Sequence, residues 1–180
     1  MESDEETVRR VLAGDAEAFR AIVERWQKPL WAMARRLVRD LQAAEDATQD
    51  AFVSAYEHLR DFDPKKAAFS TWLFTIARNR CLTVAAKRVV PTAADLPDLP
   101  GGENPIDRLE TAESWALLDA ALESLPREQK NAFVMREFSG LEYAEIAAIE
   151  GVEEGTVRSR ISRAKSALRA AVGEIVRGDS

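Results

Sequence analysis

Apolar side chains recur at helical spacing in the first part of the chain. Between residues 19 and 37 they follow an i, i+3, i+4, i+7 pattern, which is typical of one long amphipathic helix. Asp15 is a suitable N-cap for this helix, and Pro29 is expected to split it because proline lacks an amide hydrogen. The face expected to be buried consists of Phe19, Ile22, Val23, Trp26, Leu30, Met33, Ala34 and Leu37.

Two more helices are predicted before residue 89. One runs from about residue 41 to 59, and after a loop that contains Pro64 the other runs from about 70 to 88. The core-facing residues expected from the first of these helices are Ala44, Thr48, Ala51, Phe52, Ala55 and Leu59. Strand-like alternation is hard to find anywhere in the chain, so the sequence predicts an all-α fold.

The segment from residue 89 to 112 differs in composition from the rest of the chain. It holds four of the seven prolines, the Gly101-Gly102 pair, and five acidic residues against one basic residue. This composition favours an extended linker over a packed element. The chain therefore divides into two helical domains, 1–88 and 113–180, joined by a linker at 89–112.

Helical spacing resumes after the linker and ends in a predicted helix-turn-helix. Residues 142–151 are expected to form a short helix, and Gly151 can end it because glycine tolerates a left-handed backbone. A second helix follows from residue 156 to about 176. Its inward face is expected to consist of Val157, Ile161, Ala164 and Leu168.

The opposite face of this last helix carries basic and hydroxyl side chains. It is formed by Arg158, Ser162, Lys165 and Arg169, flanked by Ser159 and Arg163. A helix of this kind can enter the major groove, where arginine and serine reach base edges and phosphates. The alternative is a plain solvated face, since short helix pairs also occur in proteins that never bind DNA.

Two residues of the predicted helix-turn-helix depart from what the motif favours. Glu142 stands where serine or threonine would cap the short helix better, at an expected cost of about 1 kcal/mol. Glu150 stands where an aliphatic residue is expected at the end of that helix. Neither residue is expected to prevent folding.

The net charge of −6 hides a strong segregation of charge. Residues 65–88 carry +6 with no acidic residue, residues 156–177 carry +5, and the remainder carries −17. An acidic chain would ordinarily argue against a nucleic-acid binder. One basic segment in each predicted domain favours DNA binding instead.

The composition excludes several other classes of protein. One cysteine and one histidine leave no internal disulfide and no conventional zinc site, and no phosphate loop or catalytic triad is present. We therefore expect no enzyme activity, metal or cofactor. His58 is interpreted as a surface residue and Cys81 as a partly buried apolar one.

The acidic amino terminus and the lack of an apolar run of about 18 residues predict a cytoplasmic protein that does not insert into membranes.

The carboxy-terminal motif resembles region 4 of the extracytoplasmic-function sigma factors, a compact group of bacterial RNA polymerase subunits. The resemblance rests on LEYAEIA at 141–147, GTVRSRISRAK at 155–165 and LPRE at 125–128. It implies that the last helix binds the minus-35 promoter element while the preceding part of the domain docks on the flap of the β subunit. The DNA contacts it implies are Thr156, Arg158, Ser159, Ser162, Arg163 and Lys165.

The amino-terminal half resembles region 2 of the same family. GDAEAF at 14–19 is similar to its opening helix, and AEDATQDAF at 44–52 is similar to its polymerase-binding helix. One outward stripe of that helix consists of Asp46, Gln49, Asp50, Val53 and Glu57. The resemblance implies that this stripe docks on the β′ clamp helices of core polymerase, although a solubilising face is the alternative interpretation.

The segment FSTWLFTIARNR at 69–80 is similar to the family's minus-10 recognition helix, and DPKKAA at 63–68 occupies the loop before it. Basic side chains along a backbone path favour the single-stranded DNA that forms when a promoter melts. The implied contacts are Lys65, Lys66, Phe69, Ser70, Arg78, Asn79, Arg80, Lys87 and Arg88. Trp72 is expected to pack in the core.

The sequence thus predicts a sigma factor that binds core RNA polymerase, recognises minus-35 and minus-10 elements and helps melt promoter DNA. Its implied partners are core polymerase, promoter DNA and an anti-sigma factor, with no small-molecule substrate. The alternative is a helix-turn-helix regulator whose amino-terminal domain senses a ligand or dimerises. The acid-free segment 65–88 favours the sigma factor, because a sensor domain does not require it.

Overall fold

The computed structural model describes residues 2–38, 40–86 and 112–178, and all of the regular elements in these ranges are helices. Residues 87–111 lie outside the described residues. They include Lys87, Arg88 and the whole predicted linker except residue 112. The elements are α1 (Asp4–Leu12), η1 (Ala16–Ala18), α2 (Phe19–Leu37), α3 (Leu41–Glu57), η2 (Leu59–Asp61), α4 (Phe69–Ala86), α5 (Ala112–Ser124), α6 (Arg127–Ser139), α7 (Tyr143–Glu150) and α8 (Glu154–Gly178). The prediction of an all-α fold is confirmed.

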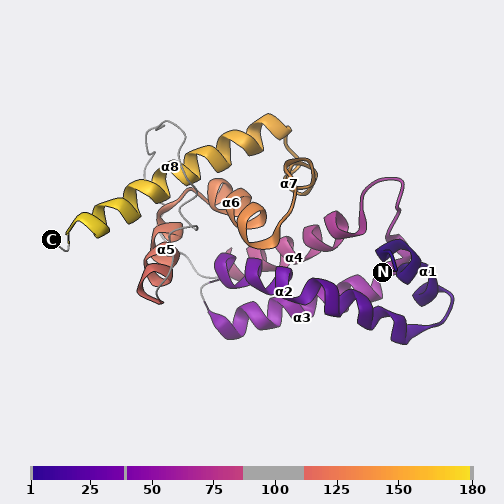
Figure 1. The fold of residues 1–180 in the computed structure, drawn as a ribbon. Helices are drawn as coiled ribbons and strands as arrows, with labels where there is room; N and C mark the ends of the chain where they lie inside the picture. The colour runs from indigo at the N-terminus through magenta and orange to yellow at the C-terminus, as the bar shows by residue number, and fades with distance from the viewer. Residues whose placement is uncertain (1, 39, 87–111, 179–180) are drawn as a thin grey trace.

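The helices form two bundles that lie against each other. In the first bundle α2, α3 and α4 pack together, and in the second α8 packs on α5, α6 and α7. Figure 1 shows the first bundle in indigo to magenta below the second in orange to yellow. The bundles meet where α6 lies on α2 and α7 lies on α4. Their buried apolar side chains form one continuous core.

The buried faces agree closely with the spacing of apolar residues. In α3 every residue expected to face the core is buried, and so are all four inward residues of α8. In α2 the pattern holds along the whole helix, although Val23 and Trp26 are only partly buried. Helical periodicity therefore placed the core correctly in both bundles.

Pro29 does not split α2, and this prediction is wrong. The helix is continuous from Phe19 to Leu37 with Pro29 inside it. Proline removes one backbone hydrogen bond, but Ile22 and Leu30 on either side of it are fully buried. The packing on both sides of the proline holds the two halves of the helix in one element.

The helix α1 was not predicted. Ser3 caps its start by accepting a hydrogen bond from the backbone amide of Glu6, and Glu6 accepts one from the amide of Ser3 at 2.8 Å. Asp4 then ties α1 to α2, because it accepts a hydrogen bond from Trp26 Nε1 at 3.0 Å and pairs with Arg25. The predicted capping role of Asp15 is present at η1, where its carboxylate accepts from the amide of Ala18 at 3.3 Å.

Candidate nucleic-acid interface

The predicted helix-turn-helix is formed by α7 and α8. Gly151 ends α7 in the left-handed conformation, with φ of 67°, as predicted. The backbone amide of Val152 then donates to the carbonyl of Ala147 at 3.1 Å, which satisfies one of the last carbonyls of α7. The next helix begins at Glu154, two residues earlier than predicted, so the turn between the helices is short.

The outward face of α8 presents polar side chains to solvent. Thr156, Arg158, Ser162 and Arg163 are exposed, whereas Ser159 is half-buried and its hydroxyl donates to the carbonyl of Thr156 at 2.9 Å. The guanidinium of Arg158 lies 4.9 Å from the centre of the Tyr143 ring and donates to Glu154 at 2.5 Å. These contacts position Arg158 at the start of the exposed face.

Lys165 is only partly exposed because it pairs with another helix, and its contact with DNA stays a prediction. Its ammonium lies 2.8 Å from a carboxylate oxygen of Glu137 on α6. Only 26% of the Lys165 side chain and 14% of the Glu137 side chain are exposed. The pair therefore joins α8 to α6 inside the second bundle.

The start of α7 is capped by Glu145. A carboxylate oxygen of Glu145 accepts from the backbone amide of Glu142 at 2.9 Å, which is one arm of a capping box. Glu142 also pairs with Arg136 at 2.8 Å, and this hydrogen bond raises the pKa of Arg136. The predicted cost of glutamate at the Glu142 position stays a prediction.

The second basic segment contains the loop before α4 and the outer face of α4. Lys65 and Lys66 are exposed in that loop, where the backbone amide of Lys65 donates to the carboxylate of Asp63 at 3.0 Å. Asn79 and Arg80 are exposed near the middle of α4. Four of the predicted minus-10 contacts are therefore accessible to a ligand.

Phe69 is not accessible in this structure, and its contact with the DNA strand stays a prediction. The residue is 2% exposed, and its ring lies 5.3 Å from that of Phe62 and 5.7 Å from that of Trp72. Trp72 is half-buried against the same cluster, which agrees with the expected core packing. The three rings anchor the start of α4 to the loop before it.

Ser70 and Arg78 face the second bundle. Ser70 is buried, and its hydroxyl donates to a carboxylate oxygen of Glu145 on α7 at 2.9 Å. Arg78 Nε donates to Glu150 Oε1, also on α7, at 2.7 Å. In this arrangement the Ser70 hydroxyl and the Arg78 guanidinium are each held by an acid of the helix-turn-helix, and their contacts with DNA stay predictions.

The outward stripe of α3 lies on the surface as predicted. Asp46, Gln49, Asp50, Val53 and Glu57 are all exposed. Three large apolar side chains of α3 are exposed with them, namely Leu41 (59% exposed), Val53 (56%) and Tyr56 (45%). Such exposed apolar groups with an acidic border are typical of a surface that binds another protein.

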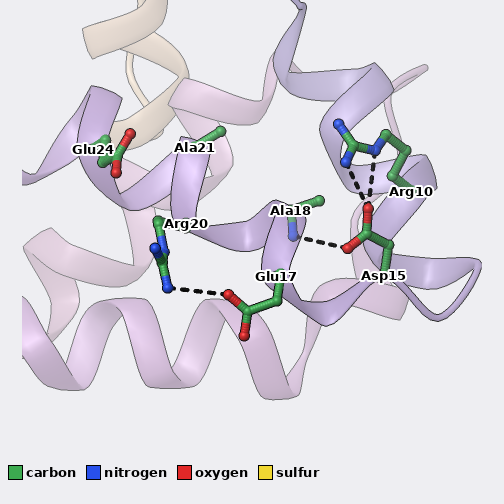
Figure 2. A pocket seen from close by; sticks show the side chains of 7 residues that line it. All are labelled: Arg10, Asp15, Glu17, Ala18, Arg20, Ala21 and Glu24. Carbon is green, nitrogen blue, oxygen red and sulfur yellow. Dashed lines mark hydrogen bonds and ion pairs between the residues drawn. The ribbon is translucent and has the colours of Figure 1, made fainter.

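A shallow pocket lies around η1. Four of the charged residues that line it pair with one another, Arg10 with Asp15 and Arg20 with Glu17 (Figure 2). No group of three metal-ligating side chains occurs in the described ranges. Within the same ranges, no helix has the length and apolar character needed to span a bilayer.

Comparison with known proteins assigns the two bundles. Residues 22–98 match Sigma-70 region 2, and residues 115–168 match Sigma-70, region 4. The RNA polymerase sigma-H factor of Pseudomonas aeruginosa is 35% identical over 189 residues, covering 98% of this chain and 97% of the relative. This chain belongs to the extracytoplasmic-function sigma factors of the sigma-70 family. The ECF RNA polymerase sigma-E factor of Escherichia coli K12 is 34% identical, covering 97% of each chain.

Solved structures of sigma factors share the fold. CnrH in complex with the cytosolic domain of CnrY superposes with a TM-score of 0.72 and 27% identity, covering 99% of this chain and 100% of CnrH. The sigma factor RpoE of Bartonella quintana, solved with the anti-sigma factor NepR, gives a TM-score of 0.67 and 26% identity, covering 86% and 96%. The first bundle of this sigma factor thus corresponds to region 2 and the second to region 4, as the sequence motifs indicated.

Proposed function

We propose that this sigma factor directs core RNA polymerase to promoters by binding the minus-35 element with α8 and the minus-10 element with α4 and its preceding loop. The observation that carries the proposal is the outward face of α8. Arg158, Ser162 and Arg163 are exposed there, while the opposite face of the same helix is buried. A helix held from behind can enter the major groove without disturbing the fold.

The minus-10 contribution rests on the exposed basic groups of region 2. Lys65 and Lys66 extend from the loop, and Asn79 and Arg80 extend from α4. Basic groups next to a helix provide a path for a single-stranded backbone. Lys87 and Arg88, which lie outside the described residues, would continue this path upstream on the same argument.

The exposed stripe of α3 is the proposed dock for the β′ clamp helices of core polymerase. Its acidic members Asp46, Asp50 and Glu57 complement a basic partner, while Val53 and Tyr56 supply apolar area. Charges at the border of such an interface set the rate and register of docking more than its affinity. Region 4 would dock separately on the β flap.

The same assignment implies an anti-sigma factor as a regulatory partner, in line with the two structural relatives that were solved with partner proteins. Sigma factors act on polymerase in the cytoplasm, where we place this chain. It would work there as a polymerase subunit without catalysing a reaction of its own and without a cofactor. We propose that residues 1–88 bind core polymerase and the minus-10 element, that residues 113–180 bind the minus-35 element, and that residues 89–112 connect the two domains.

The minus-35 assignment is tested by alanine substitution of the exposed arginines. Arg158→Ala and Arg163→Ala should each weaken the response of transcription to minus-35 mutations by roughly 1–3 kcal/mol per base contact. Arg20→Ala is the matched control, because Arg20 is 72% exposed on α2 and pairs with Glu17 on the surface. An unchanged response to minus-35 mutations in both α8 variants would remove α8 from the interface.

A further inference from the structure

Region 4 covers part of the basic face of region 2 through two acidic residues of α7. Glu145 and Glu150, one in the first turn and one at the end of this short helix, both reach α4. Glu145 accepts a hydrogen bond from Ser70, and Glu150 accepts one from Arg78 at 2.7 Å. Two of the minus-10 contacts predicted from the sequence are therefore occupied by the protein itself.

Glu150 joins the two DNA-binding helices through a single carboxylate. Its Oε1 pairs with Arg78 on α4, and its Oε2 lies 3.3 Å from Nη1 of Arg160 on α8. The Glu150 side chain is 2% exposed, and the two arginine side chains are about one-fifth exposed. A buried carboxylate is costly unless it is paired and hydrogen-bonded, and here both of its oxygens have a cationic partner.

This pairing accounts for an anomaly in the sequence. An aliphatic residue is expected at the end of the first helix of the motif, and Ile149 is already buried beside that position. Glu150 contributes nothing to that apolar packing, since its carboxylate faces Arg78 and Arg160. Its contacts instead depend on region 2 and region 4 lying together.

We propose that Glu150 is an intramolecular latch, which holds the free sigma factor closed and keeps Arg78 from promoter DNA. The DNA phosphate and the Glu150 carboxylate are anions that compete for the same guanidinium. Binding of a strand phosphate by Arg78 therefore requires Glu150 of α7 to leave its guanidinium. The part of this inference that concerns DNA rests on the function proposed above, whereas the closed arrangement of the two regions does not.

One polar contact elsewhere in the interface favours opening, although the apolar core shared by the two regions opposes it. Arg36 of α2 is only 8% exposed, and its guanidinium contacts the rings of Trp115 and Phe138 of region 4. Its Nε is 3.8 Å from Asp119 Oδ1, and neither atom has a hydrogen-bond partner. Burial lowers the pKa of Arg36, which means that its charge is poorly solvated there. Separation of the regions returns this charge to water, and this offsets part of the cost of opening.

The test compares two charge-matched variants of the full-length protein. Glu150→Gln removes the latch charge, and Glu153→Gln removes the same charge from an exposed position three residues away. We expect Glu150→Gln to increase the radius of gyration in small-angle X-ray scattering. It should also tighten binding of a fluorescein-labelled single-stranded oligonucleotide of mixed sequence at least about fivefold, as typical couplings between sites do. Glu153→Gln should change neither quantity appreciably.

A third variant tests whether the tighter strand binding depends on Arg78. In the Glu150→Gln, Arg78→Ala double variant the gain in strand affinity should vanish, because the residue that the latch occupies is missing. Persistence of the full gain there overturns the proposal, and so does an equal gain in Glu153→Gln, which would indicate a general charge effect. An unchanged radius of gyration in Glu150→Gln overturns it as well.

Glu150→Gln is tested for folding by its helical circular dichroism. If that signal is lost, Glu150→Leu provides the second test of the latch. Leucine is the kind of residue expected at this helix end, and it leaves Arg78 and Arg160 without a counter-charge in the closed form. It should open the protein and tighten strand binding as the glutamine variant does, and a compact Glu150→Leu protein contradicts the latch.

Transcription with core polymerase separates the latch proposal from the proposed function. Normal initiation without opening in the latch variants refutes only the latch, and an open protein that supports no initiation refutes the proposed function.

Discussion

At the scale of single residues, Cys81 shows how burial sets chemistry. The residue lies inside α4 and is 1% exposed. Burial raises the pKa of its thiol to about 12, because the thiolate would lie in apolar surroundings. The thiolate is the reactive form, so the native thiol should be inert at neutral pH.

We predict that Cys81 reacts with a disulfide reagent such as Ellman's reagent only when the protein opens or unfolds. Below a pKa of about 12 the thiolate fraction falls about tenfold for each unit of pH, so the native rate stays low across the physiological range. The measurement is the absorbance change over time with and without guanidinium chloride. Rapid stoichiometric reaction of the native protein would show that the thiol is accessible.

At the scale of helices, α8 carries basic side chains that pair inside the bundle and others that are exposed. The sequence alone does not distinguish them. Lys165 is fixed to Glu137 of α6, whereas Arg158 is exposed and pairs within its own helix. Both residues belong to the same basic pattern in the sequence. Their different surroundings predict different consequences of mutation.

Lys165→Ala should lower the free energy of unfolding by roughly 1–3 kcal/mol, because it leaves the carboxylate of Glu137 largely buried without this partner. Arg158→Ala should change it by less than about 1 kcal/mol, as is usual for exposed ion pairs. Urea unfolding followed by circular dichroism measures both. A larger loss of stability in Arg158→Ala than in Lys165→Ala would contradict this division of roles.

Helical periodicity predicted the core because burial repeats along each helix, and the inward residues of α3 and α8 follow it fully. The missed helix α1 carried a local signal in Ser3 and Glu6, which have capping-box spacing. The continuity of α2 through Pro29 depends on tertiary packing, which overrides the local effect of proline. The pairing of Glu150 with Arg78 joins residues 72 positions apart, so no local pattern contains it.

At the scale of the whole molecule, charge and packing act together. The chain carries +11 in its two basic segments and −17 elsewhere. The excess acid repels DNA at long range, so the free sigma factor should bind promoters poorly. Docking of the acidic stripe of α3 on polymerase would cover part of that acid, and opening of the two regions would release Arg78.

Asp119→Asn should loosen the closed form at the end of the interface distant from α7. The substitution removes the carboxylate nearest to the buried guanidinium of Arg36, and an uncompensated buried charge favours separation. We expect a larger radius of gyration in small-angle X-ray scattering than for the wild type. The control is Asp50→Asn, since Asp50 is exposed on α3 and outside the contact of the two regions. An equally compact Asp119→Asn protein would show that this pair does not stabilise closure.

As a sigma factor, this chain is expected to give RNA polymerase its promoter specificity. Run-off transcription with purified core polymerase on a library of genomic promoter fragments tests it most directly, with core polymerase alone as the control. We expect transcripts with defined start sites only when the sigma factor is added, and we expect these transcripts to depend on both the minus-35 and the minus-10 element. Absence of any start site that depends on the added protein would contradict it.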